Sequence, residues 1–137
     1  MNRVKLDSEV LGLSSLMERM TGTHVKDCFR GEDSIYFIVS PGELGKAIGK
    51  GGVTVKRVQE EFGKKIRVIE YNEDLTAFVR NVIYPLAVEE VVVDEKAVIL
   101  KDNSKKTKSL LIGRGGKNLE LINRAVKRFF SKEVKVE

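Results

Sequence analysis

The sequence predicts an α+β protein made of two tandem copies of one small unit. The first observation is a glycine motif that occurs twice, as Ile-Gly-Lys-Gly-Gly at residues 48–52 and as Ile-Gly-Arg-Gly-Gly at residues 112–116. The second is that helical and strand patterns follow one another in the same order around both motifs. The third is a constant spacing, because the motif glycines are related by an offset of 64 (113 − 49) in the numbering. Self-similarity at one offset indicates a tandem duplication.

The first copy opens with a helix and a pair of strands. Asp7 and Ser8 are suitable helix caps, and apolar residues follow at helical spacing, namely Val10, Leu13, Met17 and Met20. We expect this helix to end near Gly22. Residues 25–29 and 35–39 then match strand patterns, and the charged segment at residues 30–33 predicts the turn between them.

In the first copy the glycine motif lies between two predicted helices. Pro41 suits the start of the first of these helices. An apolar i, i+3, i+7 stripe at Val55, Val58 and Phe62 predicts the second helix. The β-branched residues of segment 65–71 predict a closing strand.

The second copy repeats this order. Its helical pattern covers residues 75–83 and stops at Pro85, and two strand patterns follow at residues 88–93 and 97–101. After the second motif the same apolar stripe recurs at Leu119, Ile122 and Val126. The motif offset also places Ile99 opposite Ile35, since 99 − 35 is again 64.

The closing strand of the second copy, residues 132–137, is related to segment 65–70 by a larger offset of 67 (132 − 65). We therefore expect the second long helix to be about one turn longer than the first. The two units are assigned to residues 1–72 and 73–137. The junction at residues 71–74 contains neither Gly nor Pro. A linker this short predicts a fixed relative orientation of the two units.

The basic residues concentrate around the glycine motifs. The chain of 137 residues carries a formal net charge of +5. Segment 46–57 has four cations and no acid, and segment 101–117 has six cations against Asp102 alone. Free N–H groups at a helix N-terminus and an adjacent cation would both face a polyanion that lies on such a turn. This distribution favours an anionic partner such as nucleic acid.

Several function classes are disfavoured. The single cysteine, Cys28, indicates a reducing environment, and no segment is apolar enough for a signal peptide or a membrane span. We therefore expect a cytoplasmic protein without a membrane partner. His24 and Cys28 are four residues apart on a predicted strand, and we interpret both as packing positions on one face. No second His or Cys completes a metal site, so we expect no metal, cofactor or catalytic residue.

A nucleotide-binding phosphate loop is the main alternative for the first motif. Segment 45–51 lacks the four-residue spacer between glycines and the Ser or Thr after lysine that such a loop needs. Neither motif has the Gly-x-Gly-x-x-Gly pattern of a dinucleotide site. We therefore do not expect an enzyme that hydrolyses nucleotides.

The repeated motif resembles the Gly-x-x-Gly signature of KH domains. The order helix, strand, strand, helix, turn, helix, strand is similar to the type II, prokaryotic form. Two such units in tandem, making up almost the whole chain, resemble the KH pair of the archaeal NusA family of transcription factors. The resemblance implies two tandem type II KH domains, each with a three-stranded mixed sheet packed against three helices.

The resemblance also implies an RNA site. KH domains hold four single-stranded nucleotides in a groove beside the glycine turn. Carried onto this chain, the RNA-binding residues are Ile48, Gly49, Lys50, Gly51, Gly52, Val55 and Lys56 in the first unit, and Ile112, Gly113, Arg114, Gly115, Gly116, Lys117 and Leu119 in the second. The closing strands, at residues 66–69 and 134–136, are expected to face the bases. The implied protein is a monomer that binds single-stranded RNA during transcription elongation, termination or antitermination, and a contact with RNA polymerase is left open.

Two other classes of function remain open. The chain could be a ribosome-associated or RNA-processing protein that uses the same RNA surface. It could also be a protein-interaction scaffold with KH folds that bind no RNA. The feature against the scaffold is that both turns keep a cation and an additional glycine, Lys50-Gly51 and Arg114-Gly115.

Overall fold

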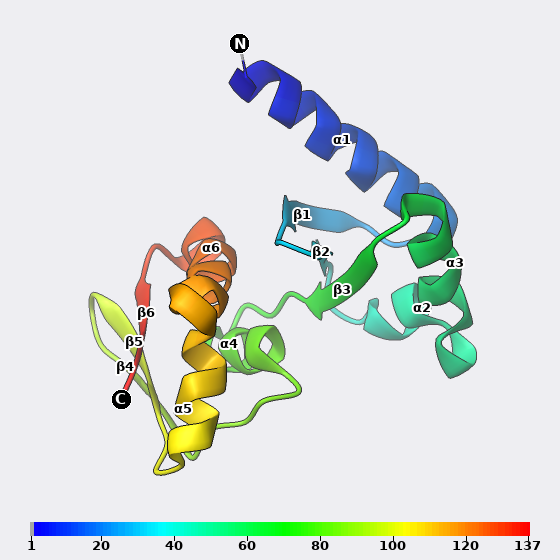
Figure 1. Cartoon of the computed structure of the whole chain (residues 1–137). Coiled ribbons are helices and arrows are strands. Elements are labelled where there is room, and N and C mark those ends of the chain that lie inside the picture. The colour runs from blue at the N-terminus through cyan, green and yellow to red at the C-terminus, as the bar shows by residue number, and fades with distance from the viewer. Residues whose placement is uncertain (1) are drawn as a thin grey trace. The chain divides into compact units, whose positions relative to one another are not determined.

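The computed structural model describes the backbone of residues 2–137 and the side chains of residues 11–137. The chain divides into two compact units, Met1–Tyr71 (unit 1) and Asn72–Glu137 (unit 2). Each unit has the element order α, β, β, α, short 3₁₀ turn, α, β (Figure 1). This order confirms the predicted α+β fold of two tandem type II KH domains.

The bounds of the elements are as follows. Unit 1 consists of α1 (Asn2–Thr21), β1 (Val25–Arg30), β2 (Ser34–Val39), α2 (Leu44–Ile48), the 3₁₀ turn η1 (Lys50–Gly52), α3 (Val53–Phe62) and β3 (Lys65–Glu70). Unit 2 consists of α4 (Leu75–Ile83), β4 (Glu90–Val93), β5 (Ala97–Lys101), α5 (Lys105–Ile112), η2 (Arg114–Gly116), α6 (Lys117–Phe130) and β6 (Glu133–Val136).

Each unit contains a three-stranded mixed sheet. In unit 1, β2 is central and pairs antiparallel with β1 and parallel with β3. In unit 2, β5 is central and pairs in the same way with β4 and β6. The parallel pair needs a crossover. In each unit this crossover consists of a helix, the glycine turn and a second helix. The helices before and after the turn therefore both connect the glycine motif to the sheet.

In unit 1 the core lies between the helices and one face of the sheet. Met17 of α1, Phe37 of β2 and Val58 of α3 are all 0% exposed and belong to one cluster. The cluster also contains Cys28, Ile35, Ala47 and Ile66. Burying a side chain such as Phe37 or Val58 contributes roughly 1.5–3 kcal/mol. The helices that flank the glycine turn are therefore fixed to the sheet by their buried sides.

The core of unit 2 uses the extra length of its last helix. α6 has 14 residues and α3 has 10, which confirms the expected extra turn. The ring of Phe78 on α4 lies 5.7 Å from the ring centres of both Phe129 and Phe130, at the end of α6. Aromatic contacts of this kind stabilise by about 0.5–1.5 kcal/mol beyond their buried area. The additional turn thus packs on α4.

Two predicted helix starts were wrong. α1 begins at Asn2, before the predicted cap residues Asp7 and Ser8. α2 begins at Leu44 and not at Pro41, because Gly42 has a left-handed φ of 81° that cannot belong to a helix. The carboxylate of Glu70 accepts hydrogen bonds from the N–H groups of Gly42 (2.8 Å) and Leu44 (3.4 Å). A residue of the closing strand therefore sets the start of α2.

The strands of the two units are related by a different offset from that of the motifs. Ile35 pairs with Ile66, and both are buried. The buried pair in unit 2 is Val98 with Val134. Val98, and not Ile99, is therefore the equivalent of Ile35, and the closing strands are offset by 68 (134 − 66) rather than 67. A shift of one residue moves every side chain to the other face of a strand.

His24 and Cys28 do not share a face. A β-bulge shifts the register of β1 between Val25 and Asp27. Because an extra residue interrupts the alternation, Cys28 is buried in the core, as predicted, whereas His24 is exposed. The Nδ1 atom of His24 lies 3.0 Å from the hydroxyl of Ser40. The prediction of a packing position is thus confirmed for Cys28 and wrong for His24.

Candidate nucleic-acid interface

The first glycine turn joins α2 to α3 through three left-handed glycines. Gly49 ends α2 with φ 79° and ψ 163°, and Gly51 and Gly52 have φ 67° and 77°. The N–H of Gly52 donates to the carbonyl of Gly49 at 3.0 Å and closes the turn. Only Lys50 within the turn has a side chain. Glycine is favoured at the other three positions because L side chains rarely adopt these torsion angles.

The second turn has the same backbone geometry. Gly113 has φ 75° and ψ 172°, and Gly115 and Gly116 have φ 64° and 78°. The N–H of Gly116 donates to the carbonyl of Gly113 at 3.1 Å. Arg114 takes the place of Lys50. Two segments far apart in the sequence therefore form the same turn around one cation.

The glycines differ in how closely other atoms approach them. A β carbon on Gly49 would lie 2.8 Å from the backbone nitrogen of Thr54, and one on Gly113 would lie 2.9 Å from that of Asn118. At Gly51 and Gly115, in contrast, no described atom lies within 4 Å of such a carbon. The first glycine of each motif is therefore required by close packing. The inner glycines leave the outer side of the turn open to a ligand.

Each turn places a helix N-terminus beside a positive charge. The N–H groups of Val53 and Lys117 already donate to the carbonyls of Lys50 and Arg114, but the N-terminus of each helix carries a partial positive charge. Gly52 and Gly116 are the N-caps of α3 and α6, and neither makes a side-chain cap. Lys50 and Arg114 are exposed beside these N-termini. This combination suits the phosphate groups of a polyanion.

None of the sequence-predicted RNA-binding residues at the two turns and the adjoining helices is buried. The exposed ones are Lys50, Gly51, Lys56, Ile112, Arg114, Gly115 and Lys117, and the partly buried ones are Ile48, Gly49, Gly52, Val55, Gly113, Gly116 and Leu119. The expectation for the closing strands is wrong for three side chains. Ile66, Ile69 and Val134 are only 6%, 4% and 1% exposed, because they pack into the cores. Their side chains are therefore not available to bases.

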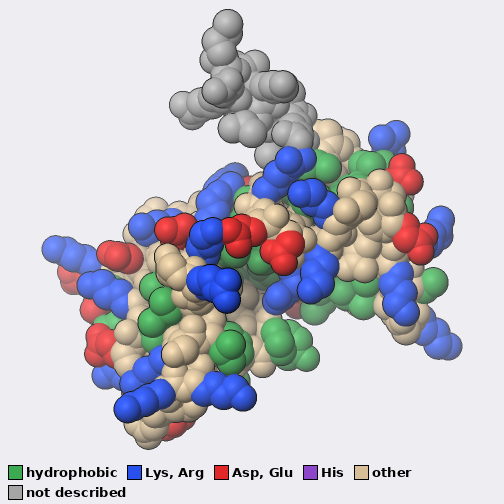
Figure 2. Space-filling view, viewed as in Figure 1, with side chains coloured by type: hydrophobic (Ala, Val, Ile, Leu, Met, Phe, Trp, Pro, Cys, Tyr) green, Lys and Arg blue, Asp and Glu red, His purple; other side chains and the backbone are tan. Residues whose placement is uncertain are grey.

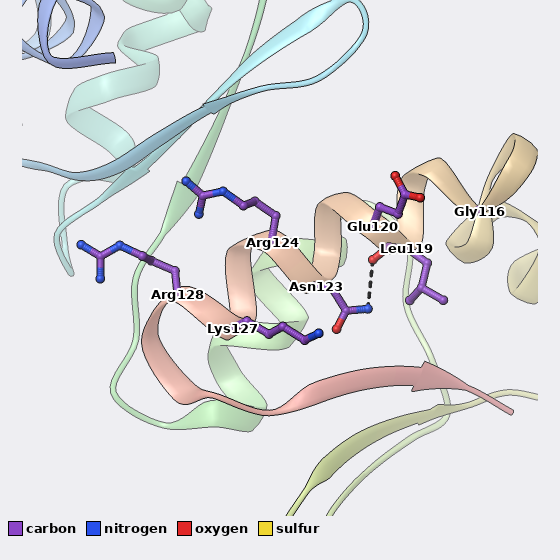
Figure 3. A pocket seen from close by; sticks show the side chains of 7 residues that line it. All are labelled: Gly116, Leu119, Glu120, Asn123, Arg124, Lys127 and Arg128. Carbon is purple, nitrogen blue, oxygen red and sulfur yellow. Dashed lines mark hydrogen bonds between the residues drawn. The ribbon is translucent and has the colours of Figure 1, made fainter. Parts of the chain in front are cut away.

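A hollow of about 640 Å³ runs along α6 from the second turn. Its lining residues are Gly116, Leu119, Glu120, Asn123, Arg124, Lys127 and Arg128 (Figure 3). The amide of Asn123 joins this helix to β6, because its Oδ1 accepts from the N–H of Val134 at 2.8 Å and its Nδ2 donates to the Val134 carbonyl at 3.1 Å. Hydrogen bonds thus fix α6 to β6 beside the hollow.

Unit 1 has a hollow of about 400 Å³ at the equivalent place on α3. Its lining residues are Lys56, Gln59, Glu60, Gly63, Lys64 and Lys65. Along the helices the motif offset of 64 holds, so that Gln59 corresponds to Asn123 (123 − 59). The Oε1 of Gln59 accepts from the N–H of Ile66 at 3.2 Å, which joins α3 to β3. The same polar clamp therefore lies beside both hollows.

Comparison with known proteins supports a nucleic-acid interface. The KH domain family matches residues 34–83, a segment that includes the first glycine turn. The probable transcription termination protein NusA of Methanococcus vannielii is 40% identical over 86% of this chain and 70% of its own length. The protein of the same name from Methanocaldococcus jannaschii is 35% identical over 93% of this chain and 72% of its own length. This chain belongs to the NusA-like family of KH proteins.

The fold of this NusA-like chain also matches a solved structure. The crystal structure of APE1850 has 34% sequence identity and a TM-score of 0.75, and the match covers 93% of this chain and 96% of that one. The similarity therefore extends over both KH units and is not limited to the segment that the KH family matches.

Net charge alone does not locate the interface of the NusA-like chain. In Figure 2, Lys and Arg side chains are spread over the visible surface, with Asp and Glu side chains among them. What distinguishes Lys50 and Arg114 is their place beside an open glycine turn and an uncapped helix N-terminus. Backbone geometry together with charge therefore distinguishes the two turns as the candidate interface.

Sequence reasoning missed the cations of the second hollow. Arg124, Lys127 and Arg128 lie on the side of α6 that continues from Gly116. The signal was present, since residues 116, 120, 123, 124 and 127 share one helical face. Exposed cations on an amphipathic helix, however, match an ordinary solvated surface. The hollow becomes recognisable only in three dimensions.

Within residues 11–137, no group of three or more His, Cys, Asp and Glu side chains is arranged to hold a metal ion. In the same described part of the NusA-like chain, none of the helices combines the length and the apolar character needed to cross a membrane.

Proposed function

We propose that this protein binds single-stranded RNA through both glycine turns and acts on nascent transcripts as a transcription termination or elongation factor. The observation that carries the proposal is the repetition of one turn geometry. Gly49, Gly51 and Gly52 have φ values of 79°, 67° and 77°, and their equivalents in unit 2 have 75°, 64° and 78°. Each turn holds one cation beside an uncapped helix. The names of the archaeal relatives support a role in transcription termination.

In the proposed complex, RNA phosphates lie on the open side of each turn. The backbone N–H groups and the Lys50 or Arg114 side chain supply charge-assisted hydrogen bonds to the phosphate oxygens. Bases lie toward the apolar side chains that flank the turns. Ile112 is 39% exposed and Val53 is 55% exposed, so apolar surface is accessible beside both turns. The chain has no Trp, and only 7% of its residues are aromatic, so stacking is not the main source of affinity.

The test places negative charge on each turn in the full chain. In unit 1 the variant is Lys50→Asp with Gly51→Asp, and in unit 2 it is Arg114→Asp with Gly115→Asp. Asp and Asn tolerate the left-handed conformation of Gly51 and Gly115 better than other L residues do. The matched control therefore places Asn at the same two positions. It tests the backbone change without the negative charge.

We expect either Asp variant to remain folded by circular dichroism and to bind single-stranded RNA at least tenfold more weakly than its Asn control. Two Asp variants that bind as tightly as their Asn controls would leave the interaction scaffold as the better explanation. Crosslinking in cells followed by sequencing of the bound RNA tests the role in transcription. Nascent transcripts are expected, whereas enrichment of mature ribosomal RNA would support the ribosome-associated alternative.

A further inference from the structure

The last turn of α6 carries two exposed cations that the core does not use. The buried side of this helix consists of Ile122, Ala125 and Val126, whereas Lys127 and Arg128 are exposed. The Arg128 guanidinium lies 5.2 Å from the ring centre of Phe129, and its charge remains at the surface. Figure 3 shows Lys127 on the same side of the helix as Asn123. Both cations line the hollow that begins at Gly116.

The hollow is long enough for RNA to continue beyond the glycine turn. With a rise of about 1.5 Å per residue, Lys127 lies about 16 Å along the helix axis from Gly116. The hollow between them is continuous, with Leu119 and Asn123 in its lining. A strand whose phosphates lie on the turn and which then follows α6 would reach both cations.

Unit 1 does not offer the same arrangement. The residue equivalent to Lys127 is Gly63, which follows the end of α3 and has no side chain. The residue equivalent to Arg124 is Glu60, an acid in the middle of the smaller hollow. The cations of that hollow lie at its two ends, Lys56 at one and Lys64 with Lys65 at the other. In unit 2 the one acid of the hollow, Glu120, lies in the first turn of α6, and Arg124, Lys127 and Arg128 follow it with no acid between them in the lining. An unbroken run of cations toward the end of the helix is therefore a property of unit 2.

We propose that Lys127 and Arg128 form a second phosphate-binding site, here called the distal site, which extends the RNA footprint of unit 2 beyond its glycine turn. The ligand is the phosphodiester backbone of the same single-stranded RNA, so this inference rests on the proposed function. Lys and Arg each donate charge-assisted hydrogen bonds to phosphate oxygens. These contacts add affinity and footprint length without reading sequence.

A structural role is the alternative explanation. Cations in the last turn of a helix stabilise it by about 0.3–1 kcal/mol through the helix dipole. Such a role predicts a small loss of stability on substitution and no effect on RNA binding. The salt dependence of binding separates the two, because each phosphate contact to a single strand contributes a slope of about −0.7 to log K against log salt.

The experiment measures this slope for the full chain with an unstructured RNA of about twelve nucleotides. For the variant Lys127→Gln with Arg128→Gln, we expect a slope less steep than that of the parent by about 1.4, that is, two contacts of about 0.7 each. The exchange Lys127→Arg with Arg128→Lys keeps both charges and should keep the parental slope. The matched control, Arg19→Gln with Lys96→Gln, removes the same net charge from exposed residues that lie outside both basic segments and both hollows. It should leave the slope nearly unchanged.

RNA length gives a second measurement. In a background with Lys50→Asp and Gly51→Asp, unit 2 is the remaining RNA-binding unit. Loss of the distal cations should then weaken binding of an RNA of about eight nucleotides but not of one of about four nucleotides, which the turn and its groove accommodate. Equal slopes for the Gln variant and the parent would overturn the distal site if the parent binds RNA. A parent that binds no RNA would instead overturn the proposed function.

Discussion

Gly113 lies directly against Asn118. A β carbon on Gly113 would come within 2.7 Å of the β carbon of Asn118. The side-chain amide of Asn118 donates to the carbonyls of Leu111 at 2.9 Å and Leu110 at 3.2 Å, so its position is fixed across the turn. The end of α5 and the start of α6 are therefore held together at the point where the first motif glycine has no room for a side chain.

This packing predicts unequal costs for two similar substitutions. Gly113→Ala places a side chain in a glycine-only backbone region and against Asn118, and should destabilise unit 2 by about 3 kcal/mol or more. Gly115→Ala also has a left-handed φ but meets open space, and should cost about 1–2 kcal/mol. Urea unfolding followed by circular dichroism measures both. Equal urea midpoints for the two variants would show that the close contact with Asn118 adds nothing to the destabilisation caused by Gly113→Ala.

The salt dependence and strand preference of the parent give the next prediction. If four to six cations contact phosphate, log K should fall against log salt with a slope of roughly −3 to −4. Binding to single-stranded RNA should be tighter than binding to a duplex of the same sequence, because the KH groove accepts unpaired bases. Fluorescence anisotropy at several salt concentrations measures both quantities. A flat salt response, or a preference for duplex, would contradict the proposed interface.

The clamp beside each hollow predicts a difference in stability between the units. Asn123 bonds to both backbone groups of Val134 and also donates to the carbonyl of Leu119 at 3.2 Å. Gln59 joins its own strand by accepting from the N–H of Ile66. Asn123→Ala should therefore destabilise its unit by about 2–3 kcal/mol and Gln59→Ala by about 1 kcal/mol. Hydrogen exchange at the backbone of β6 and β3 reports each effect locally. If the backbone amides of β6 and β3 exchanged equally slowly in both variants and in the parent, the side-chain hydrogen bonds of Asn123 and Gln59 would not be stabilising the units.

α4 was predicted with the correct bounds because it has strong local signals at both ends, whereas β4 begins at Glu90 and not at the predicted residue 88. α4, Leu75–Ile83, lies between Asp74, whose carboxylate accepts from the N–H of Ala77 at 3.1 Å, and Pro85. The start of α2, which depends on a residue distant in the sequence, was not predicted correctly. α2 begins three residues after Pro41 because Glu70 bonds to the backbone at Gly42 and Leu44. No local pattern contains that information.

The predicted strand register failed for a related reason. The motif offset is set by the glycine turns and holds along the helices that follow them. Between β5 and the second motif the chain contains one residue more than in unit 1, so Val98 rather than Ile99 faces the core. Apolar residues occupy both positions, and their hydrophobicity alone does not select the face. The turn residues were easier to predict because glycine carries its own conformational signal.

The last prediction concerns the two turns acting on one RNA. Each KH groove holds about four nucleotides, and the two units are joined by a junction without glycine or proline. Once one unit holds an RNA, the other meets the same strand at a high effective concentration, so avidity can exceed either affinity by ~10²-fold. An RNA of about four nucleotides should therefore bind poorly, and one of about nine to twelve nucleotides much more tightly. The variant Lys50→Asp with Gly51→Asp should lose this gain and keep the weak binding of short RNA, whereas its Asn control, which lacks the Lys50 cation but adds no negative charge, should keep part of the gain. A smooth rise of affinity with length, unchanged by the Asp substitutions, would mean that the two turns do not act together.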